Sequence, residues 1–269
     1  VEALPVGHQR LSKIIIVERE AKTMMSDSDN HNTLRNRLLA ALPPGEIGRL
    51  KPHLELFELT KGEVIYNAGD TICYVYFPER GMVSLLSTTS RGDTIGVGVA
   101  GFEGMIGGAL ALKARQIPFR AVVQIPGNAW RIRAEILREE FGNCGATHDL
   151  MLLYTNAVLA QVTQSAVCNH FHTSQRRLCR WLLVSLDHSE EDTLPLTQEY
   201  IAMILGIQRS RVATITSGLQ RRGLISYRWG RLKILDRAGL EATSCECYRV
   251  DKATTITSLK NYISQFVHA

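Results

Sequence analysis

The stretch LTQEYIAMILGIQRSRVATITSGLQRRG, residues 196–223, constrains the fold of this chain most strongly. Ile201 and Ile204 recur at helical spacing behind Thr197, whose hydroxyl can accept a hydrogen bond from an unpaired amide at a helix start. Gly206 then interrupts the pattern, and glycine adopts the left-handed conformation of a tight turn without strain. The stretch therefore predicts two short helices joined by a sharp turn.

The second of these helices, predicted over residues 208–222, has two different faces. Val212, Ile215 and Leu219 form an apolar stripe that would pack on the first helix. The other face and the helix start are polar, with side chains of a size that reaches base edges and phosphates in a DNA groove. These side chains are Gln208, Arg209, Ser210, Arg211, Thr214, Ser217 and Arg221.

Beyond Gly223, the residues LISYRWGRLKIL predict two strands around Trp229-Gly230, with Arg228 and Arg231 near the tip. Residues 207–237 hold eight basic side chains and one acid, whereas the whole chain has a net charge of only +5. Such a local basic block favours a polyanionic partner, and tip arginines suit phosphate contacts. The order of these parts predicts a winged helix-turn-helix that binds DNA. The alternative is a winged helix used for protein contacts.

Residues 54–132 have a different pattern, with short runs of Val, Ile and aromatic residues separated by turn signals. The expected turns are Lys61-Gly62, Ala68-Gly69-Asp70, Arg80-Gly81, Arg91-Gly92-Asp93 and Pro126-Gly127-Asn128. Short strands at regular spacing indicate a β-barrel or sandwich. The preceding segment, residues 32–54, predicts short helices that pack on it.

A long helix is predicted over residues 146–168, and it is apolar nearly all round, which requires burial on more than one side. One side can face the β-domain, and a heptad pattern on another favours a coiled-coil dimer. The expected dimer-interface residues are Leu150, Leu153, Ala157, Ala160, Gln164 and Val167. The alternative is a helix buried in a monomer.

The order of β-roll, long helix and winged helix-turn-helix resembles the Crp/Fnr family of bacterial transcription regulators over residues 34–248. The resemblance implies an α+β chain with a double-stranded β-helix (jelly-roll, cyclic-nucleotide-binding-like) sensor domain at residues 31–145. A dimerisation helix (146–169) and a DNA-binding domain (170–248) would follow, between a disordered extension (1–30) and a C-terminal tail (249–269). It implies a cytoplasmic homodimer whose partners are a pseudo-palindromic double-stranded DNA operator, RNA polymerase and an effector that the sequence does not identify.

Carried over position by position, the resemblance places Arg209 where the family commonly reads bases, while Thr197 and Glu199 fall near phosphate-contacting positions. A glutamate does not favour phosphate. Ser210 and Thr214 stand where cyclic-AMP-responsive members have an acid and an arginine, so a different DNA sequence is expected. The predicted DNA-contacting residues are Thr197, Gln208, Arg209, Ser210, Arg211, Thr214, Arg221, Arg228 and Arg231.

The sensor segment MIGGALALKARQIPFRAVVQ departs from the cyclic-nucleotide-binding members. Gly108, preceded by Gly107, stands where those members have a glutamate for the ribose, and Phe119-Arg120 stands where they have Arg-Ser for the phosphate. A polar site that lacks a partner loses affinity steeply. We therefore expect no cyclic AMP binding of the usual kind at these four residues. The alternative is a cyclic-nucleotide-dependent regulator with a rearranged pocket.

The six cysteines are expected to be free packing residues, with no metal or cofactor. Cys245-Glu246-Cys247 is a close pair without companions for a four-ligand site. Cys168, His170, His172 and Cys179 offer zinc ligands near the hinge, but a packed hinge is the preferred interpretation. The rival class, a cupin-like enzyme or ligand-binding module, needs clustered histidines, and the sequence has none between His53 and His148. Neither an enzyme nor a membrane-spanning segment is expected.

Overall fold

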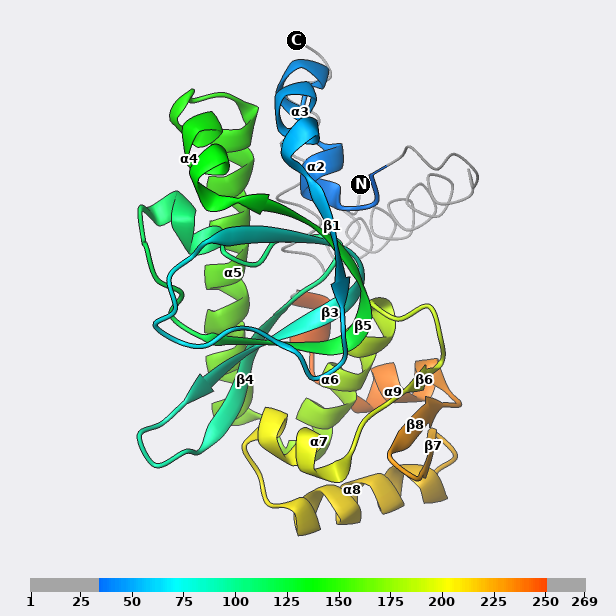
Figure 1. The fold of residues 1–269 in the computed structure, drawn as a ribbon. Helices are drawn as coiled ribbons and strands as arrows, with labels where there is room; N and C mark the ends of the chain where they lie inside the picture. Colours follow the sequence, from blue (N-terminus) through cyan, green and yellow to red (C-terminus); the bar gives the residue numbers. More distant parts are fainter. Residues whose placement is uncertain (1–33, 251–269) are drawn as a thin grey trace, which may run out of the picture. The chain divides into compact units, whose positions relative to one another are not determined.

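The computed structural model describes residues 34–250, so the predictions for residues 1–30 and for most of the tail lie outside the described residues. An antiparallel β-domain is followed by a long helix and a helix-turn-helix, which confirms the predicted fold class (Figure 1). Among residues 34–250, no helix is long and apolar enough to cross a bilayer.

The β-domain is one antiparallel sheet in the order β1-β5-β3-β4, with β2 also paired to β5. Its strands are β1 (Glu55–Leu59), β2 (Val64–Tyr66), β3 (Tyr74–Thr88), β4 (Thr94–Ala100) and β5 (Arg120–Arg133). Apolar side chains fill its interior, among them the fully buried Val83, Ile117 and Val123. The predicted class of short-stranded β-domain is therefore observed, although β3 and β5 are long.

Two of the predicted turns are wrong, because β3 runs through Arg80-Gly81 and β5 runs through Pro126-Gly127-Asn128. The pairing register of the two strands shifts there. A Cβ on Gly81 would lie 2.5 Å from the Ile125 carbonyl oxygen, and one on Gly127 would overlap the Arg80 carbonyl. These glycines therefore allow two bent strands to approach closely. Glycine is needed here for this close approach and not, as predicted, for a turn.

Short helices precede the sheet, as predicted: α2 (Arg37–Ala40), α3 (Pro44–Leu50) and the 3₁₀ turn η1 (Lys51–His53). A second 3₁₀ turn, η2 (Gly108–Leu112), lies between β4 and β5, and α4 (Ala134–Gly142) leads into the long helix α5 (Ala146–Phe171). This helix ends at Phe171 rather than at the predicted Cys168, and it lies along the sheet (Figure 1). The Gln161 side chain on α5 accepts a hydrogen bond from the Val99 amide of β4 at 3.0 Å.

The C-terminal part has its own apolar core and a three-stranded sheet in the order β6-β8-β7. Its elements are α6 (Ser174–Asp187), β6 (Thr193–Leu194), α7 (Gln198–Leu205), α8 (Arg209–Arg221), β7 (Ile225–Arg228), β8 (Arg231–Ile234) and α9 (Arg237–Thr243). Met82 and Leu86 of β3 also belong to this core. Packing between the β-domain and the helix-turn-helix is therefore continuous.

Candidate nucleic-acid interface

Local chemistry sets the two helices of the motif as the sequence predicts. The Thr197 hydroxyl accepts a hydrogen bond from the Tyr200 amide at 3.1 Å and caps α7. Gly206 ends α7 in the left-handed region, with φ of +59°. From α6, the Arg177 guanidinium donates to the Leu205 carbonyl and so satisfies an unpaired acceptor at the end of α7.

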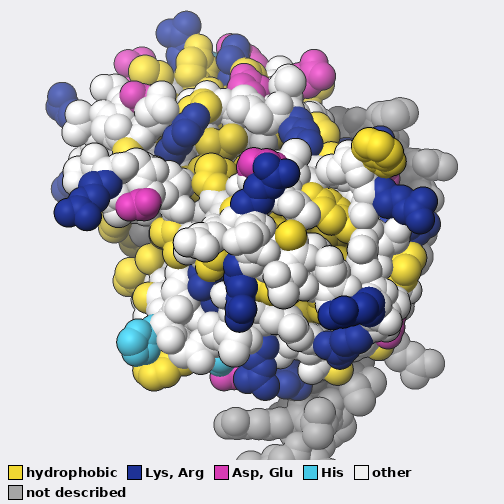
Figure 2. Space-filling view, turned by 90° about the horizontal axis from the view of Figure 1, so that it is seen from below, with side chains coloured by type: hydrophobic (Ala, Val, Ile, Leu, Met, Phe, Trp, Pro, Cys, Tyr) yellow, Lys and Arg dark blue, Asp and Glu magenta, His cyan; other side chains and the backbone are white. Residues whose placement is uncertain are grey.

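The two faces of α8 are separated as predicted. Val212, Ile215 and Leu219 are buried in the C-terminal core. The residues predicted to contact DNA are all exposed, and they come from the start of α7, from α8 and from the wing: Thr197, Gln208, Arg209, Ser210, Arg211, Thr214, Arg221, Arg228 and Arg231. Figure 2 views the molecule from this side and shows Lys and Arg side chains over much of the face.

Arg209 at the start of α8 is held by the preceding helix. Its Nη1 lies 2.7 Å from a carboxylate oxygen of Glu199, and its Nε donates to Gln198 at 3.5 Å. Both charged side chains are mostly exposed, so the pair adds little to stability. Glu199 thus contacts Arg209, and the structure gives this acid a partner other than a phosphate.

Two further polar residues of α8 interact within the helix. The Thr214 hydroxyl donates to the Ser210 carbonyl at 3.1 Å, which is the usual bond of a helical threonine one turn back. Ser210 and Thr214 are both exposed. These small groups suit contacts to thymine methyl groups and to base edges rather than charged readout.

The wing is a two-residue hairpin bonded to α8 and to the segment that leads into α7. Arg228 and Arg231 pair across its tip, and Trp229 and Gly230 between them have φ of +53° and +71°, as in a type I′ turn. Tyr227 places the hairpin, because its amide donates to Gln220 at 2.6 Å and its hydroxyl donates to the Leu196 carbonyl at 3.0 Å. Trp229 is 98% exposed and was not among the predicted contact residues. The sequence feature that could have pointed to Trp229 is its place as an aromatic residue at the tip of a basic hairpin.

On α5, the exposed face is not the predicted dimer face. Leu150 and Ala157 are only 2% and 7% exposed within the single chain, and Gln164 donates to the Cys247 sulfur. Large apolar side chains project from the other side of the helix: Leu152, Leu159, Val162 and Val167. Of the six residues predicted for the interface, Val167 belongs to this exposed set, while Leu153 and Ala160 are half-buried.

The four residues predicted for an effector pocket lie at the start of η2 and at the start of β5. Gly107, with φ of +98°, caps η2, and a Cβ on Gly108 would lie 3.1 Å from the Met105 side chain and 3.7 Å from Tyr154. Phe119 packs on the core, and Arg120 is exposed at the start of β5. Met105 and Tyr154 are therefore the neighbours that a side chain at position 108 would contact.

A hollow of about 990 Å³ lies on the sensor beside η2, and the four residues predicted for the pocket are not part of its lining. Its lining includes the basic residues Lys113, Arg115, Arg133 and Arg138, together with the exposed Cys73 and Cys144. The hollow is open to solvent, and its charge favours anions over cations.

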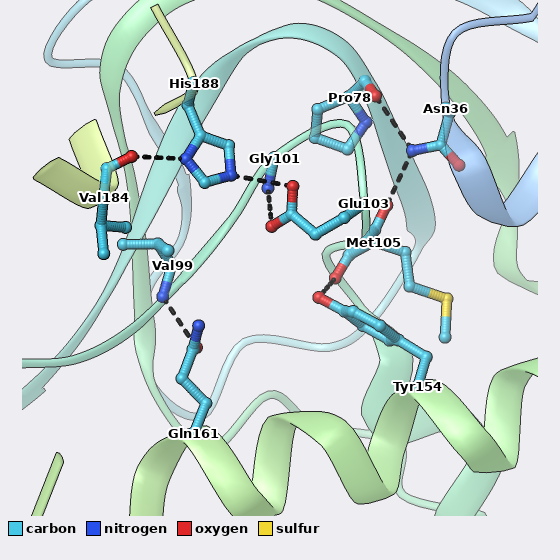
Figure 3. A network of polar contacts seen from close by, with 11 residues as sticks. Asn36, Pro78, Val99, Gly101, Glu103, Met105, Tyr154, Gln161, Val184 and His188 are labelled. Atoms are coloured by element: carbon cyan, nitrogen blue, oxygen red, sulfur yellow. Dashed lines mark hydrogen bonds and ion pairs between the residues drawn. The ribbon is translucent and has the colours of Figure 1, made fainter. Parts of the chain in front are cut away.

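A buried ion pair joins the sensor to the end of α6 (Figure 3). His188 Nε2 lies 2.8 Å from a carboxylate oxygen of Glu103, and His188 Nδ1 lies 2.7 Å from the Val184 carbonyl oxygen. The Val184 carbonyl and the ionised Glu103 carboxylate can only accept hydrogen bonds. Both ring nitrogens of His188 therefore donate, and the imidazole is charged. Burial opposes this charge, but the nearby Glu103 carboxylate outweighs it and raises the pKa of His188 to about 9.

A second buried polar contact links the same two parts. The Gln124 amide of β5 donates to the Ser185 hydroxyl of α6 at 2.9 Å and accepts a bond from Ser84. The Tyr200 hydroxyl of α7 lies 3.2 Å from the Ser84 hydroxyl. Strands β3 and β5 are therefore bonded to both α6 and α7, which carry the helix that presents Arg209.

Comparisons with known proteins agree with this architecture. Residues 56–143 match the model of the cyclic nucleotide-binding domain, and residues 176–243 match the model of the Crp-like helix-turn-helix domain. A comparison with functionally curated proteins gave no match.

Solved structures share the fold. A Crp/Fnr-family transcriptional regulator from Eubacterium rectale has 18% identity and a TM-score of 0.62, with 77% of this chain and 96% of that chain covered. FixK2 from Bradyrhizobium japonicum has 17% identity and a TM-score of 0.61, covering 71% and 98%. The regulator CLP of Xanthomonas campestris, described as c-di-GMP responsive, has 17% identity and a TM-score of 0.59, covering 72% and 100%.

The two domain matches together cover more than half of the chain, with the cyclic nucleotide-binding match before the helix-turn-helix match. The chain therefore contains a cyclic nucleotide-binding domain followed by a Crp-like helix-turn-helix domain, and it shares the fold of Crp/Fnr-family regulators.

Proposed function

We propose that this protein regulates transcription in the bacterial cytoplasm by binding a pseudo-palindromic operator as a homodimer, with RNA polymerase as a further partner. The observation that carries the proposal is the row of exposed residues at the start of α8, in which Arg209 is held by Glu199 beside a basic wing. Arginine held in this way suits bidentate contact with guanine in the major groove. Arg228 and Arg231 at the wing tip suit phosphate contact.

For the dimer, we propose the exposed apolar face of α5, defined by Leu152, Leu159, Val162 and Val167, as the surface that meets a second copy of the chain. Two antiparallel or parallel helices of this length can bury such a stripe against each other. A dimer is also what the DNA task requires, since two recognition helices must enter grooves about 34 Å apart.

For the sensor, we propose a signal other than cyclic AMP held by the usual ribose and phosphate groups, because Gly108 and Phe119-Arg120 stand where those groups would need a glutamate and Arg-Ser. Whatever the signal, it must bind the two states of the protein with different affinity. The contacts of Glu103 with His188 and of Gln124 with Ser185 supply a route by which a change in the sensor can move the DNA-binding helices.

The Arg209→Ala variant tests base recognition by α8. We expect it to weaken binding to the preferred operator by about 1–3 kcal/mol and to relax the choice of base at one position of each half-site. Arg231→Ala should instead weaken binding to all sequences alike and lower the salt dependence of the affinity. Fluorescence anisotropy with operator and scrambled duplexes at several salt concentrations measures both effects. Equal, sequence-independent losses for the two variants would contradict the assignment.

A further inference from the structure

Four side chains that are far apart in the sequence meet at the junction between α5 and the DNA-binding domain. Cys168 lies in the last turn of α5, His172 follows the helix as its C-cap, and Cys245 and Cys247 follow α9. Their sulfur and ring nitrogen atoms all lie within 4.8 Å of one another. The three cysteines are at most 3% exposed. The fold therefore supplies the companions that the Cys245-Glu246-Cys247 pair lacks in the sequence, and the earlier prediction of an isolated pair is wrong.

Two separations within the cluster have the size found in a mononuclear tetrahedral site, and all four atoms lie within 4.8 Å of one another. The sulfurs of Cys168 and Cys245 are 3.6 Å apart, and the Cys247 sulfur is 3.4 Å from His172 Nδ1. Tetrahedral zinc with its usual bonds to sulfur and nitrogen holds its ligand atoms about 3.5–3.8 Å apart. A disulfide brings its sulfurs to roughly 2 Å. An iron–sulfur cluster places iron and sulfide between its thiolates and so spreads them further than this cluster allows.

The surroundings of the four residues also suit a metal site. His172 presents Nδ1 to the sulfurs, and its other ring nitrogen lies 3.2 Å from a carboxylate oxygen of Glu246. A histidine that ligates a metal commonly donates its second N–H to a carboxylate in this way, which fixes the ring and its tautomer. The Gln164 amide donates to the Cys247 sulfur at 3.0 Å, as expected beside a thiolate.

The segment that carries Cys245 and Cys247 is also held in place independently. The Tyr248 hydroxyl, one residue further on, donates to the Asp187 carboxylate of α6 at 2.8 Å and accepts a bond from Arg237 at 2.7 Å. The ligands therefore need no large rearrangement to close on an ion.

From this geometry we infer that Cys168, His172, Cys245 and Cys247 form a closed zinc site of the Cys₃His type. Three thiolates and one imidazole select zinc among the common divalent ions, and four protein ligands leave no open position for catalysis. The role is structural: the ion joins the end of α5, which carries the proposed dimer face, to the C-terminal segment of the DNA-binding domain. The angle between the two is set at this junction.

The test is the metal content of the full-length chain, purified under reducing conditions without chelator from zinc-supplemented cells. We expect about one zinc ion per chain, and exchange for Co²⁺ should give the visible bands of tetrahedral cobalt with a thiolate charge-transfer band. Cys245→Ser should lose most of the bound metal. Cys179→Ser, which changes another buried cysteine outside the cluster, and His170→Ala should keep it.

The His172→Cys variant is the control for a loss of metal that is caused only by misfolding. It should retain the metal as a Cys₄ site and strengthen the thiolate-to-cobalt band. A wild-type chain that takes up neither zinc nor cobalt would overturn the inference, as would equal metal content in Cys245→Ser and Cys179→Ser. These readouts need no DNA, so their failure is separate from a failure of the proposed function.

Discussion

His188→Ala is expected to lower the unfolding free energy by about 3–5 kcal/mol, because it leaves the Glu103 carboxylate buried without its cation. Glu103 and His188 are both nearly buried, with side-chain exposures of 14% and 10%. Gly101 donates its amide to the same carboxylate, and Phe102 packs on the imidazole ring, so solvent has little access to relieve the charge. Urea denaturation at constant pH measures the loss.

The same pair gives a pH dependence with a definite sign. The folded pKa of His188, about 9, exceeds the value of 6.5 for an ordinary histidine, chiefly through Glu103 with a smaller effect of Asp187, and against the effect of burial. Its stabilisation is therefore complete below about pH 6.5 and is lost as the pH rises to about 9. The pKa of Glu103 is lowered, with burial opposing and the His188 charge favouring the shift, so its contribution is lost in acid.

His188→Gln should abolish the decline of the urea midpoint between pH 6.5 and 9, while the wild-type protein shows it. Glu103→Gln combined with His188→Gln should be less destabilised than the sum of the single changes, since neither charge is then left alone. A wild-type midpoint that does not change over this pH range would contradict the charged pair.

Leu159→Glu is expected to break the proposed dimer and to reduce operator affinity by about 10²-fold or more, because the second half-site then adds no avidity. Leu159 is 63% exposed on the apolar face of α5, and a carboxylate there would have to be buried in the interface. Leu56→Glu is the matched control, since Leu56 is equally exposed at 63% but lies on β1. Sedimentation equilibrium and operator binding measure the two effects.

The control variant should remain dimeric and bind the operator like the wild type. A Leu159→Glu chain that stays dimeric at micromolar concentration would show that another surface joins the two copies. A wild-type chain that is monomeric with and without DNA would contradict the dimer itself.

The local chemistry of the DNA-binding motif could be predicted from the sequence because its determinants lie close together. The Thr197 cap, the Gly206 turn and the stripe of α8 involve neighbours within one or two turns, and each is observed. The wing hairpin likewise follows from Trp229-Gly230 and the alternating residues beside it. In these segments the residues that interact with one another are only a few positions apart in the sequence.

Features that depend on distant partners were missed or assigned to the wrong side. Periodicity shows that α5 is apolar all round, but it does not say which side the chain's own sensor covers, so Leu150 was assigned to a partner. Cys168 and Cys245 are 77 residues apart, and Glu103 and His188 are 85 apart. Only the packing of β4 and η2 on α5, and of α6 on α9, brings such pairs within reach. Gly127 resembles a turn signal because close backbone approach and chain reversal both require glycine.

The central claim, that two copies of α8 read a two-fold symmetric DNA site, is tested most directly by selecting bound duplexes from a random pool with the purified full-length chain. We expect enrichment of an inverted repeat whose half-sites are centred about one helical turn, roughly 34 Å, apart. With the Arg209→Ala variant, the same selection should lose preference at one symmetric pair of positions. Enrichment of a single asymmetric site, or none above non-specific binding, would contradict recognition of a two-fold symmetric site by two copies of α8.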